Sequence, residues 1–390
     1  MEQVTPSILF LDHAGALGGA ELYLLDIIHH HQSKATVVTL EDGDFPKQLR
    51  ADGVDVQVLS SSGALKSVKK KAPLTRALRA IPDVLKTARS VAKLAESHDV
   101  VYANSQKALV VGGIAGWWSG RPVIWNLHDI LTADHFSALN RWVAVQWSRW
   151  FVDRIIVNSE ATRAAYIASG GSAERTGLVY NGIDSSPFDE VDSSTVRRIR
   201  SELGIDAVPT VGVFSRLAPW KGQHVLINAL ADLPNVHAVL VGEALFKGDD
   251  PYARRLRTLA HQLGIAERIH FLGFRRDIPQ LMKAVDIVAH TSTAPEPFGR
   301  VIVEGQLAQR PVVATEAGGA LEIIGHGDTG FLIPPDNPEA LARTIQRLID
   351  EPTLAHSVAQ RGRTVASDRF STTRMLNAVN NELATVLSST

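Results

Sequence analysis

The chain has 390 residues, a length that predicts two domains with separate cores. Its 40 Lys and Arg residues nearly balance its 41 Asp and Glu residues, so no overall electrostatic field favours nucleic acid as a partner. It has no cysteine, which excludes disulfides, thiol catalysis and thiolate metal ligands.

Short apolar runs alternate with longer helical patterns through the first half of the chain. Such alternation predicts a parallel sheet with helices on both faces. The expected strands are 8–11, 36–40, 54–59, 100–103, 123–127 and 155–158. The expected helices are 21–30, 74–95, 105–118, 138–151 and 161–169.

The pattern breaks at YNGIDSSPFD, near Tyr180, which is rich in turn-forming residues and predicts an interdomain hinge. A second alternating series follows, and segment 371–387 is expected as a last helix that can pack on either half. The later strands are expected at 210–214, 238–241, 269–272, 287–290 and 312–314, and the helices at 222–233, 252–263, 278–284, 299–309, 338–349 and 353–366. Ligands bind beyond the carboxyl ends of parallel strands, so we expect the function in a cleft between two doubly wound halves.

The first expected strand runs into HAGALGGAELYLL, in which Gly15, Gly18 and Gly19 precede a helix beginning near Ala20. Glycines let the backbone approach a ligand closely, and a helix amino end suits a phosphate. The spacing GxGxxG is absent, which disfavours a nicotinamide cofactor. The alternative is a turn needed only for tight packing of strand and helix.

The fifth expected strand ends in WNLHD, which places His128 and Asp129 at its carboxyl end. An uncharged imidazole there could bind a substrate hydroxyl, although a lone His is more often structural. The 14 His residues show no paired metal-ligand spacing, so no metal site is expected.

The first strand of the second half is followed by RLAPWKG, with Arg216 and Lys221 five positions apart in a loop. A loop can converge two cations on one diphosphate, where they would stabilise the charge that develops on a leaving nucleotide. The alternative is two unrelated surface charges.

The most informative segment is TAPEPFGRVIVE at 293–304. Two prolines keep Glu296 in a loop, whereas Glu304 falls on the following helix. The first-turn N–H groups, around Phe298 to Val301, favour an anion or hydroxyl oxygens. A carboxylate can accept two hydrogen bonds from a ribose diol, and the alternative for Glu304 is a solvated helix face. Paired acids also occur in glycosidases, but that reading leaves Arg216, Lys221 and the two similar halves unexplained.

Together these segments resemble the retaining glycosyltransferases usually called family 4, over nearly the whole chain. The matching segments are GGAE at 18–21, HD at 128–129, VNSEATRAAY at 157–166, NGID at 181–184, SRLAPWKG at 215–222 and ExFGxxxxE at 296–304. The resemblance implies an α/β protein of the GT-B fold, with two Rossmann-like doubly wound domains facing a central cleft. It implies an acceptor-binding domain at 1–184, a nucleotide-sugar-binding domain at 185–370, and a final helix, 371–390, that returns to the first domain.

The resemblance also assigns roles to the motif residues. Arg216 and Lys221 would bind the donor diphosphate, Glu304 the ribose and Glu296 the transferred sugar. Further donor contacts would come from Gly18, Gly19, Gly273, Phe274, Phe298, Gly299, Arg300 and Val301, with His128 beside the sugar. Such enzymes use a UDP- or GDP-sugar, need no metal or other cofactor, and retain the anomeric configuration through front-face attack. Many relatives carry histidine where this chain has Asn104 and Ser105, so acceptor contacts there cannot be transferred.

The segment from Lys66 to Lys93 is basic and helical in pattern. Its cations are Lys66, Lys69, Lys70, Lys71, Arg76, Arg79, Lys86, Arg89 and Lys93, against the single acid Asp83. A basic amphipathic helix is attracted to anionic bilayers, which suggests peripheral attachment and a lipid-linked or cell-envelope glycan acceptor. The alternative is a solvated helix that covers the sheet.

The leading hypothesis is therefore a hexosyltransferase. The alternatives are a nucleotide-sugar 2-epimerase of the same fold and an inactive sugar-nucleotide-binding partner protein. The beginning MEQVTP is not a signal peptide, and no apolar window reaches about 18 residues, so we expect a cytoplasmic protein, attached at most to the inner face of the membrane.

Overall fold

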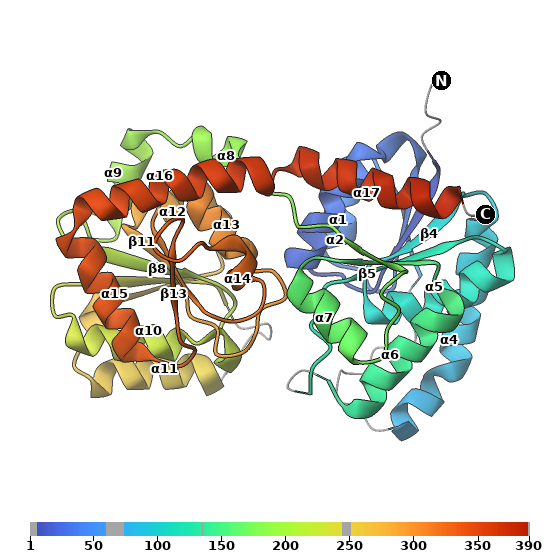
Figure 1. The fold of residues 1–390 in the computed structure, drawn as a ribbon, viewed down its shortest axis with the longest axis horizontal. Coiled ribbons are helices and arrows are strands. Elements are labelled where there is room, and N and C mark those ends of the chain that lie inside the picture. The colour runs from blue at the N-terminus through green and yellow to red at the C-terminus, as the bar shows by residue number, and fades with distance from the viewer. Residues whose placement is uncertain (1–5, 60–73, 134–135, 244–250, 389–390) are drawn as a thin grey trace. The chain divides into compact units, whose positions relative to one another are not determined.

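The structure, a computed structural model, describes residues 6–59, 74–133, 136–243 and 251–388. The chain divides into two compact units (Figure 1). The first unit contains Met1–Gly182 and Thr372–Thr390, and the second contains Ile183–Ser371. The chain passes from the first unit to the second within the NGID segment, between Gly182 and Ile183, and the carboxyl-terminal helix belongs to the first unit.

The first unit contains a seven-stranded parallel sheet in the order β3-β2-β1-β4-β5-β6-β7. Its strands are β1 Ile8–Asp12, β2 Ala35–Thr39, β3 Asp55–Val58, β4 Val100–Ala103, β5 Val123–Leu127, β6 Arg154–Val157 and β7 Thr176–Leu178. Strands β1, β4 and β5 are buried along their whole length, as expected where helices cover both faces of a sheet.

Helices cover both faces of this sheet. They are α1 Gly19–His30, η1 Gln32–Lys34, α2 Asp44–Ala51, α4 Leu74–Ala95, α5 Gln106–Ser119, α6 Ala138–Phe151, α7 Glu160–Ala168 and α17 Thr372–Leu387. Side chains alternate along β1, so Leu9 and Leu11 pack with α4, α5 and α6, whereas Ile8 and Phe10 pack with α1 and α17.

Helix α17 buries one apolar stripe in the first unit. Met375, Val379, Leu383 and Val386 recur at helical spacing and join the core around β1 and α1. Arg154 of β6 also donates a hydrogen bond to the Glu382 carboxylate. The stripe and the ion pair explain why this segment is a helix that packs on a sheet.

The second unit contains a six-stranded parallel sheet in the order β10-β9-β8-β11-β12-β13. Its strands are β8 Thr210–Phe214, β9 His237–Val241, β10 Ile269–Gly273, β11 Ile287–His290, β12 Val312–Thr315 and β13 Phe331–Ile333. Its helices are α8 Ser186–Asp189, α9 Ser193–Glu202, η2 Pro219–Lys221, α10 Gln223–Ala229, η3 Leu230–Asp232, α11 Pro251–Gln262, η4 Ala266–Arg268, α12 Ile278–Ala284, α13 Arg300–Leu307, α14 Ala320–Ile323, α15 Pro338–Asp350 and α16 Pro352–Arg369.

Some elements differ from the expectations. Strands β7 and β13 have three residues each and were not predicted, and neither was helix α2. On α4, for which attraction to a bilayer and cover of the sheet were the alternatives, the larger apolar side chains of the described part do not form the packed face. Ile81 and Leu85 are 46% and 43% exposed, whereas Ala88, Val91 and Ala92 are buried against α5. Small side chains bring α4 close to α5 and leave the larger ones in solvent.

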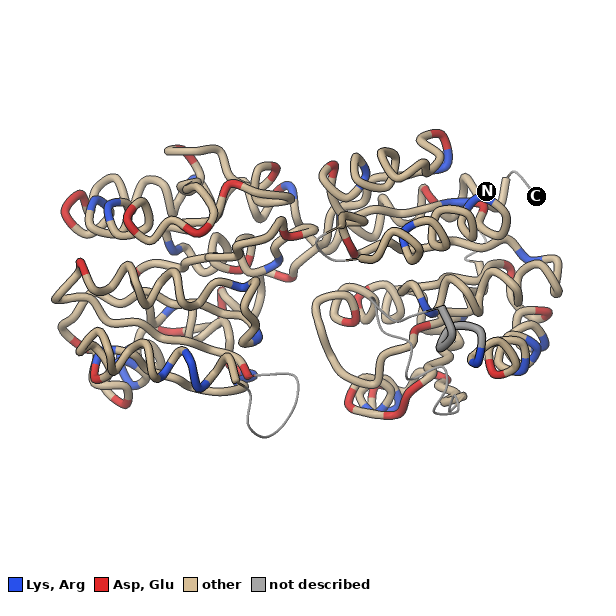
Figure 2. Tube along the Cα trace, turned by 90° about the horizontal axis from the view of Figure 1, so that it is seen from below, with Lys and Arg blue, Asp and Glu red and all other residues tan. Residues whose placement is uncertain are grey.

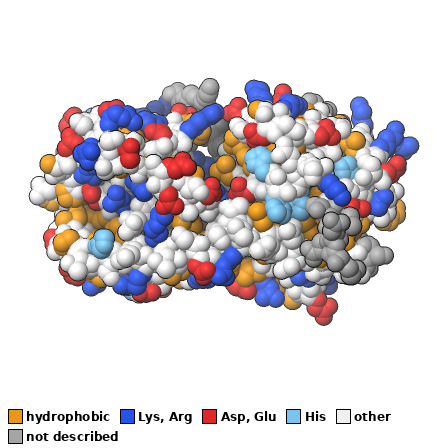
Figure 3. Space-filling view, turned by 90° about the horizontal axis from the view of Figure 1, so that it is seen from above, with side chains coloured by type: hydrophobic (Ala, Val, Ile, Leu, Met, Phe, Trp, Pro, Cys, Tyr) orange, Lys and Arg blue, Asp and Glu red, His pale blue; other side chains and the backbone are white. Residues whose placement is uncertain are grey.

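Charges of both signs are distributed along each unit. Lys and Arg positions and Asp and Glu positions are interspersed along the backbone trace (Figure 2). The face drawn in Figure 3 likewise mixes basic, acidic and apolar side chains. Within the described ranges, no helix has the length and apolar character needed to cross a bilayer.

Candidate active site

The strand order of the second sheet reverses between β8 and β11. In open parallel sheets the loops at such a point leave a crevice beyond the carboxyl ends of the strands, where ligands bind. The loop after β8 carries Arg216 and Lys221, and the loop after β11 carries Glu296. The fold therefore brings these three side chains to one edge of one sheet.

Lys221 and Glu296 form an ion pair at this edge. The Lys221 Nζ donates to Glu296 Oε2 at 2.6 Å, and both side chains are about 15% exposed. Ser292 Oγ donates to the same oxygen at 3.2 Å, and His290 Nε2 lies 3.4 Å from it. Burial alone raises the pKa of Glu296, but Lys221 and His290 outweigh burial and hold that pKa well below its usual range. Glu296 is therefore ionised at neutral pH.

The two loops are fastened to each other by backbone contacts. Thr293 N donates to Trp220 O at 2.8 Å, and Thr291 Oγ1 donates to Lys221 O at 3.0 Å. Between them, Gly222 has a φ of 68°, and a Cβ there would lie 1.9 Å from Thr291 O. Glycine is required at this position because of both the positive φ and the close approach.

Trp220 lies under both cations of the first loop. The Lys221 Nζ is 4.2 Å from the centroid of the Trp220 ring, and the Arg216 guanidinium carbon is 5.5 Å from it. These distances fall in the range of cation–π attraction. The ring therefore restricts the positions that the exposed Arg216 side chain and the mostly buried Lys221 side chain can adopt.

Helix α13 begins beside Glu296. Gly299 precedes it with a φ of 99°, and Phe298 is buried against Phe370, with ring centroids 5.5 Å apart. Val301, in the first turn, lines the same small hollow as Lys221 and His290. The amino end of a helix is positive and favours an anion or hydroxyl oxygens.

Glu304 lies one turn further along α13. Its Oε1 is 3.6 Å from Arg300 Nε, and both side chains are about one fifth exposed or less. Burial raises the pKa of Glu304 more than the neighbouring Arg300 lowers it. A ligand hydroxyl that donates to this carboxylate would stabilise its ionised form.

The loop after β12 holds Glu296 from the other side. Gly319 N donates to Glu296 O at 2.9 Å, and Gly318 forms an isolated bridge with Glu296. Gly318 has a φ of 63°, and a Cβ there would lie 2.2 Å from Glu296 O. Sequence reasoning missed these glycines, although a glycine pair in the loop after an expected strand was a usable signal.

Gly273 ends β10 and Phe274 follows it at the same edge. Gly242 N donates to Gly273 O at 2.8 Å, and Leu217 N donates to Glu243 O at 3.0 Å. These bonds link the loops after β8, β9 and β10 to one another. Phe274 is 62% exposed, so its ring is available to a flat ligand group.

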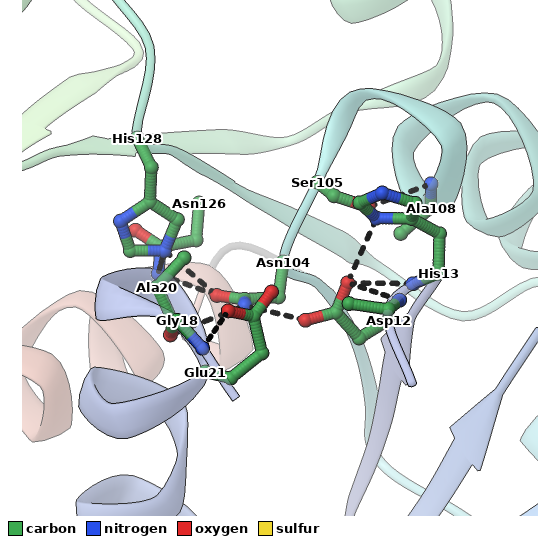
Figure 4. Close-up of polar contacts among 11 residues, drawn as sticks. Asp12, His13, Gly18, Ala20, Glu21, Asn104, Ser105, Ala108, Asn126 and His128 are labelled. Atoms are coloured by element: carbon green, nitrogen blue, oxygen red, sulfur yellow. Dashed lines mark hydrogen bonds and ion pairs between the residues drawn. The ribbon is translucent and has the colours of Figure 1, made fainter. Parts of the chain in front are cut away.

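The first unit has a separate polar network where its own strand order reverses, between β1 and β4 (Figure 4). Asp12, at the end of β1, is fully buried, and Asn104 Nδ2 donates to its Oδ2 at 2.8 Å. That bond turns Asn104 Oδ1 toward β5, where Asn126 Nδ2 donates to it at 2.9 Å and His128 Nε2 lies 2.8 Å from it. The orientation of His128 is thus coupled to Asp12 through Asn104.

Glu21 lies beside this network in the first turn of α1. Its Oε2 accepts a hydrogen bond from Gly18 N at 2.9 Å (Figure 4). Burial and the nearby Asp12 charge raise the pKa of Glu21 to about 7. Burial also raises the pKa of Asp12, but bonds from His13 and Asn104 outweigh it and leave that pKa lowered. The GGAE segment therefore caps the amino end of α1 and places the Glu21 carboxyl, which titrates near neutral pH, beside the ionised Asp12.

The structure brings together, within the second unit, the predicted residues Arg216, Lys221, Gly273, Phe274, Glu296, Phe298, Gly299, Arg300, Val301 and Glu304. Gly18, Gly19 and His128 lie in the first unit, and their contact with a donor stays a prediction. Sequence reasoning missed Asp12, Asn126, Trp220, His290 and Ser292. Three of them, Asp12, His290 and Ser292, stand at or just beyond strand ends, a position that could have identified them.

Comparisons with known proteins assign the class. The family model described as Glycosyltransferase Family 4 matches residues 17–186, and the model described as Glycosyl transferases group 1 matches residues 196–365. The chain is also 43% identical to HepE of Anabaena, over 97% of this chain and 99% of HepE, with a TM-score of 0.88. The chain therefore belongs to the group 1 glycosyltransferases of the GT-B fold.

Two further relatives differ in what they support. The D-inositol 3-phosphate glycosyltransferase of Mycolicibacterium gilvum is 36% identical over 198 residues, which are half of this chain and 43% of that protein. Sucrose-phosphate synthase from Thermosynechococcus elongatus has a TM-score of 0.80 over 98% of this chain and 99% of its own, but only 18% identity, so it supports the fold alone. HepE has been crystallised with UDP-glucose, with UDP and glucose, and with UDP.

Proposed function

We propose that the enzyme transfers a hexose from a UDP-sugar to an acceptor hydroxyl with retention of anomeric configuration and without a metal. The observation that carries the proposal is the Lys221–Glu296 pair at the strand-order reversal of the second unit, beside the amino end of α13. UDP is chosen over GDP because HepE, which is crystallised with UDP-glucose, is 43% identical to this chain over almost its whole length.

The diphosphate would bind between Arg216, Lys221 and the first turn of α13. Breaking the bond between the sugar and phosphate leaves negative charge on the nucleoside diphosphate. Preorganised cations stabilise such charge by about 3 to 4 kcal/mol per donor group. Because Trp220 holds both cations, the site can supply this charge from side chains, and we propose that no metal is required.

The sugar and nucleoside would bind on either side of the diphosphate. Glu296 is ionised and would accept hydrogen bonds from sugar hydroxyls, in exchange for part of its contact with Lys221. Glu304 would accept hydrogen bonds from the ribose diol. The exposed Phe274 ring, with Gly273, would contact the uracil base.

The transfer would proceed on one face of the sugar. The bond between C1 and the phosphate oxygen breaks while the acceptor oxygen bonds to C1 from the same face. The acceptor proton passes to the departing phosphate oxygen, so no side-chain nucleophile is needed. Gly18, Gly19 and His128 of the first unit would contact the diphosphate and the transferred sugar.

The acceptor is proposed to be a lipid-linked or cell-envelope glycan. Of the basic segment that suggested it, Lys66 to Lys71 lie outside the described residues. Four cations of the described part of α4, Arg79, Lys86, Arg89 and Lys93, are exposed. They support attraction to an anionic membrane surface.

The test is incubation of the enzyme with UDP- and GDP-sugars, followed by NMR of the products. The proposal predicts UDP release with initial formation of the same anomer, unaffected by EDTA, and loss of turnover in Glu296→Gln. An epimerised donor would favour the 2-epimerase, and binding without turnover would favour the inactive partner protein. Initial release of the inverted anomer would contradict retention.

A further inference from the structure

Four of the seven tryptophans of the chain are exposed on two neighbouring helices of the first unit. Trp117 and Trp118, at the end of α5, are 70% and 44% exposed, and Trp142 and Trp150 of α6 are 60% and 80% exposed. Tryptophan is usually well buried, so four exposed rings on adjacent helices require an explanation. We call these four residues the tryptophan surface.

The four rings belong to two helices that pack against each other. Leu139, Trp142 and Trp150 recur at helical spacing on the side of α6 that faces away from the core, and Leu139 is also exposed. The Trp117 ring is 6.4 Å from the ring of Phe151, the neighbour of Trp150. The end of α5 therefore meets the end of α6, and the surface extends across both helices.

Basic side chains flank the tryptophan surface. Helix α4 packs against α5 in the same core cluster (Figure 1), and Arg121 Nη2 donates to Glu96 O at 2.7 Å where the two helices end. Lys93 and Arg89, near that end of α4, are exposed, and so is Arg149 beside Trp150. Exposed acids, Glu96, Asp99 and Asp153, lie at the same end, so the excess of cations is a property of α4, whose described part exposes Arg79, Lys86, Arg89 and Lys93.

Trp117, Trp118 and Trp150 are remote from the polar network of the first unit. In a parallel α/β unit, helices run antiparallel to the strands, so the ends of α4, α5 and α6 lie at the edge opposite to Asp12, Asn104 and His128. A change at Trp117 or Trp150 should therefore leave those residues in place.

We propose that the tryptophan surface inserts its rings into the interface of an anionic bilayer, with the exposed cations of α4 and Arg149 contacting lipid headgroups. Tryptophan is enriched at membrane interfaces because its ring is apolar while its N–H is polar. The flanking cations are the charge complement of anionic lipid. Membrane binding by this surface does not depend on the proposed function. Only the link to a lipid-linked acceptor rests on that function.

The experiment measures sedimentation of the full chain with phosphatidylcholine vesicles, with and without about one third phosphatidylglycerol. We expect binding to the anionic vesicles at low salt, weakened at high salt as screening increases. The double variant Trp142→Ala/Trp150→Ala should bind at least about tenfold more weakly, because two exposed rings leave the interface. Arg89→Glu/Lys93→Glu should lose the preference for anionic lipid.

Control variants distinguish the loss of membrane binding from the loss of the folded structure. Leu263→Ala, which removes an exposed apolar side chain at the end of α11 in the second unit, should bind vesicles like the wild type. Both tryptophans are exposed, so the double variant should keep its melting temperature and its UDP release from UDP-sugar without vesicles. If the wild type binds vesicles but releases no UDP from a UDP-sugar, the result contradicts the proposed function and leaves the membrane inference intact.

Three results would overturn the inference. The wild type could fail to bind anionic vesicles at low salt, or the double variant could bind them equally well. Alternatively, gel filtration could show a dimer that dissociates in Trp142→Ala/Trp150→Ala, which would assign the surface to a second copy of the chain.

Discussion

Lys221 Nζ donates to Glu296 Oε2 across 2.6 Å, joining the loops that follow β8 and β11. The two residues are 75 positions apart, and each would be a costly buried charge without the other. Without ligand the pair is neutral overall. A donor that brings phosphate charge to Lys221 and hydroxyl groups to Glu296 can replace the ion pair with a stronger set of hydrogen bonds and charge contacts.

Removing Lys221 should affect both activity and stability. Lys221→Ala leaves Glu296 without its cation, so we expect a loss of about 3 kcal/mol in the free energy of unfolding and about a 100-fold fall in kcat. A double-mutant cycle with Glu296→Gln should show strong non-additivity in urea unfolding. Additive effects would mean that the ion pair contributes nothing in solution. The matched control is Arg343→Ala, an exposed cation of α15, which should change neither quantity.

A methyl group at Gly318 should displace Glu296. Gly318→Ala combines a φ of 63° with a Cβ 2.2 Å from Glu296 O, so we expect a lower melting temperature and a raised KM for the donor. Gly327→Ala is the control, since its φ is 74° but a Cβ there would meet no atom within 4 Å. Gly327→Ala should cost about 1 kcal/mol in stability from the backbone alone and leave KM unchanged. Equal KM values for the two variants would contradict the role given to Gly318.

The Glu21 carboxyl should make stability depend on pH. Its pKa is about 7 in the folded chain, against 4.5 ordinarily, so the folded state binds more protons and stability falls as pH rises from about 4.5 to 7. The difference corresponds to about 3 kcal/mol. Glu21→Gln should remove this fall, so that its stability relative to the wild type increases between pH 5 and pH 8 in urea unfolding. The idea fails if the two proteins show parallel pH dependence.

Asn104 should act as a positioning residue for His128. Asn104→Ala removes the amide that joins Asp12 to His128, so we expect about a tenfold lower kcat with an unchanged dissociation constant for UDP, because the cations proposed to bind the diphosphate, Arg216 and Lys221, lie in the second unit. Asn381→Ala, at an exposed position of α17, is the control and should change neither value. A weaker UDP affinity in Asn104→Ala would show that the network serves the donor directly.

Much of the fold was accessible from the sequence because buried parallel strands are almost continuously apolar. The runs at β1, β4 and β5 were predicted within one or two residues for this reason. Strands β7 and β13 were missed because three residues give no measurable periodicity. The packed face of α4 was not identified from the sequence because small residues, Ala88 and Ala92, form it, whereas the larger Leu85 is exposed.

The site was predictable where a motif has fixed spacing and less so where distant segments meet. Arg216, Lys221, Glu296 and Glu304 follow from two short segments, and the structure brings these segments to one sheet edge. The link from Asp12 through Asn104 to His128 depends on neighbouring strands that are far apart in the chain, so no local pattern reveals it. The expected cleft between the domains stays a prediction.

Lys221, held beside Glu296, is proposed to bind the diphosphate of a UDP-sugar. Titration calorimetry of UDP into the wild type, Lys221→Ala and Arg343→Ala tests it most directly. We expect saturable binding to the wild type and to Arg343→Ala, with affinity at least about tenfold weaker in Lys221→Ala. Equal affinity in all three proteins, or no binding of UDP to the wild type, would contradict it.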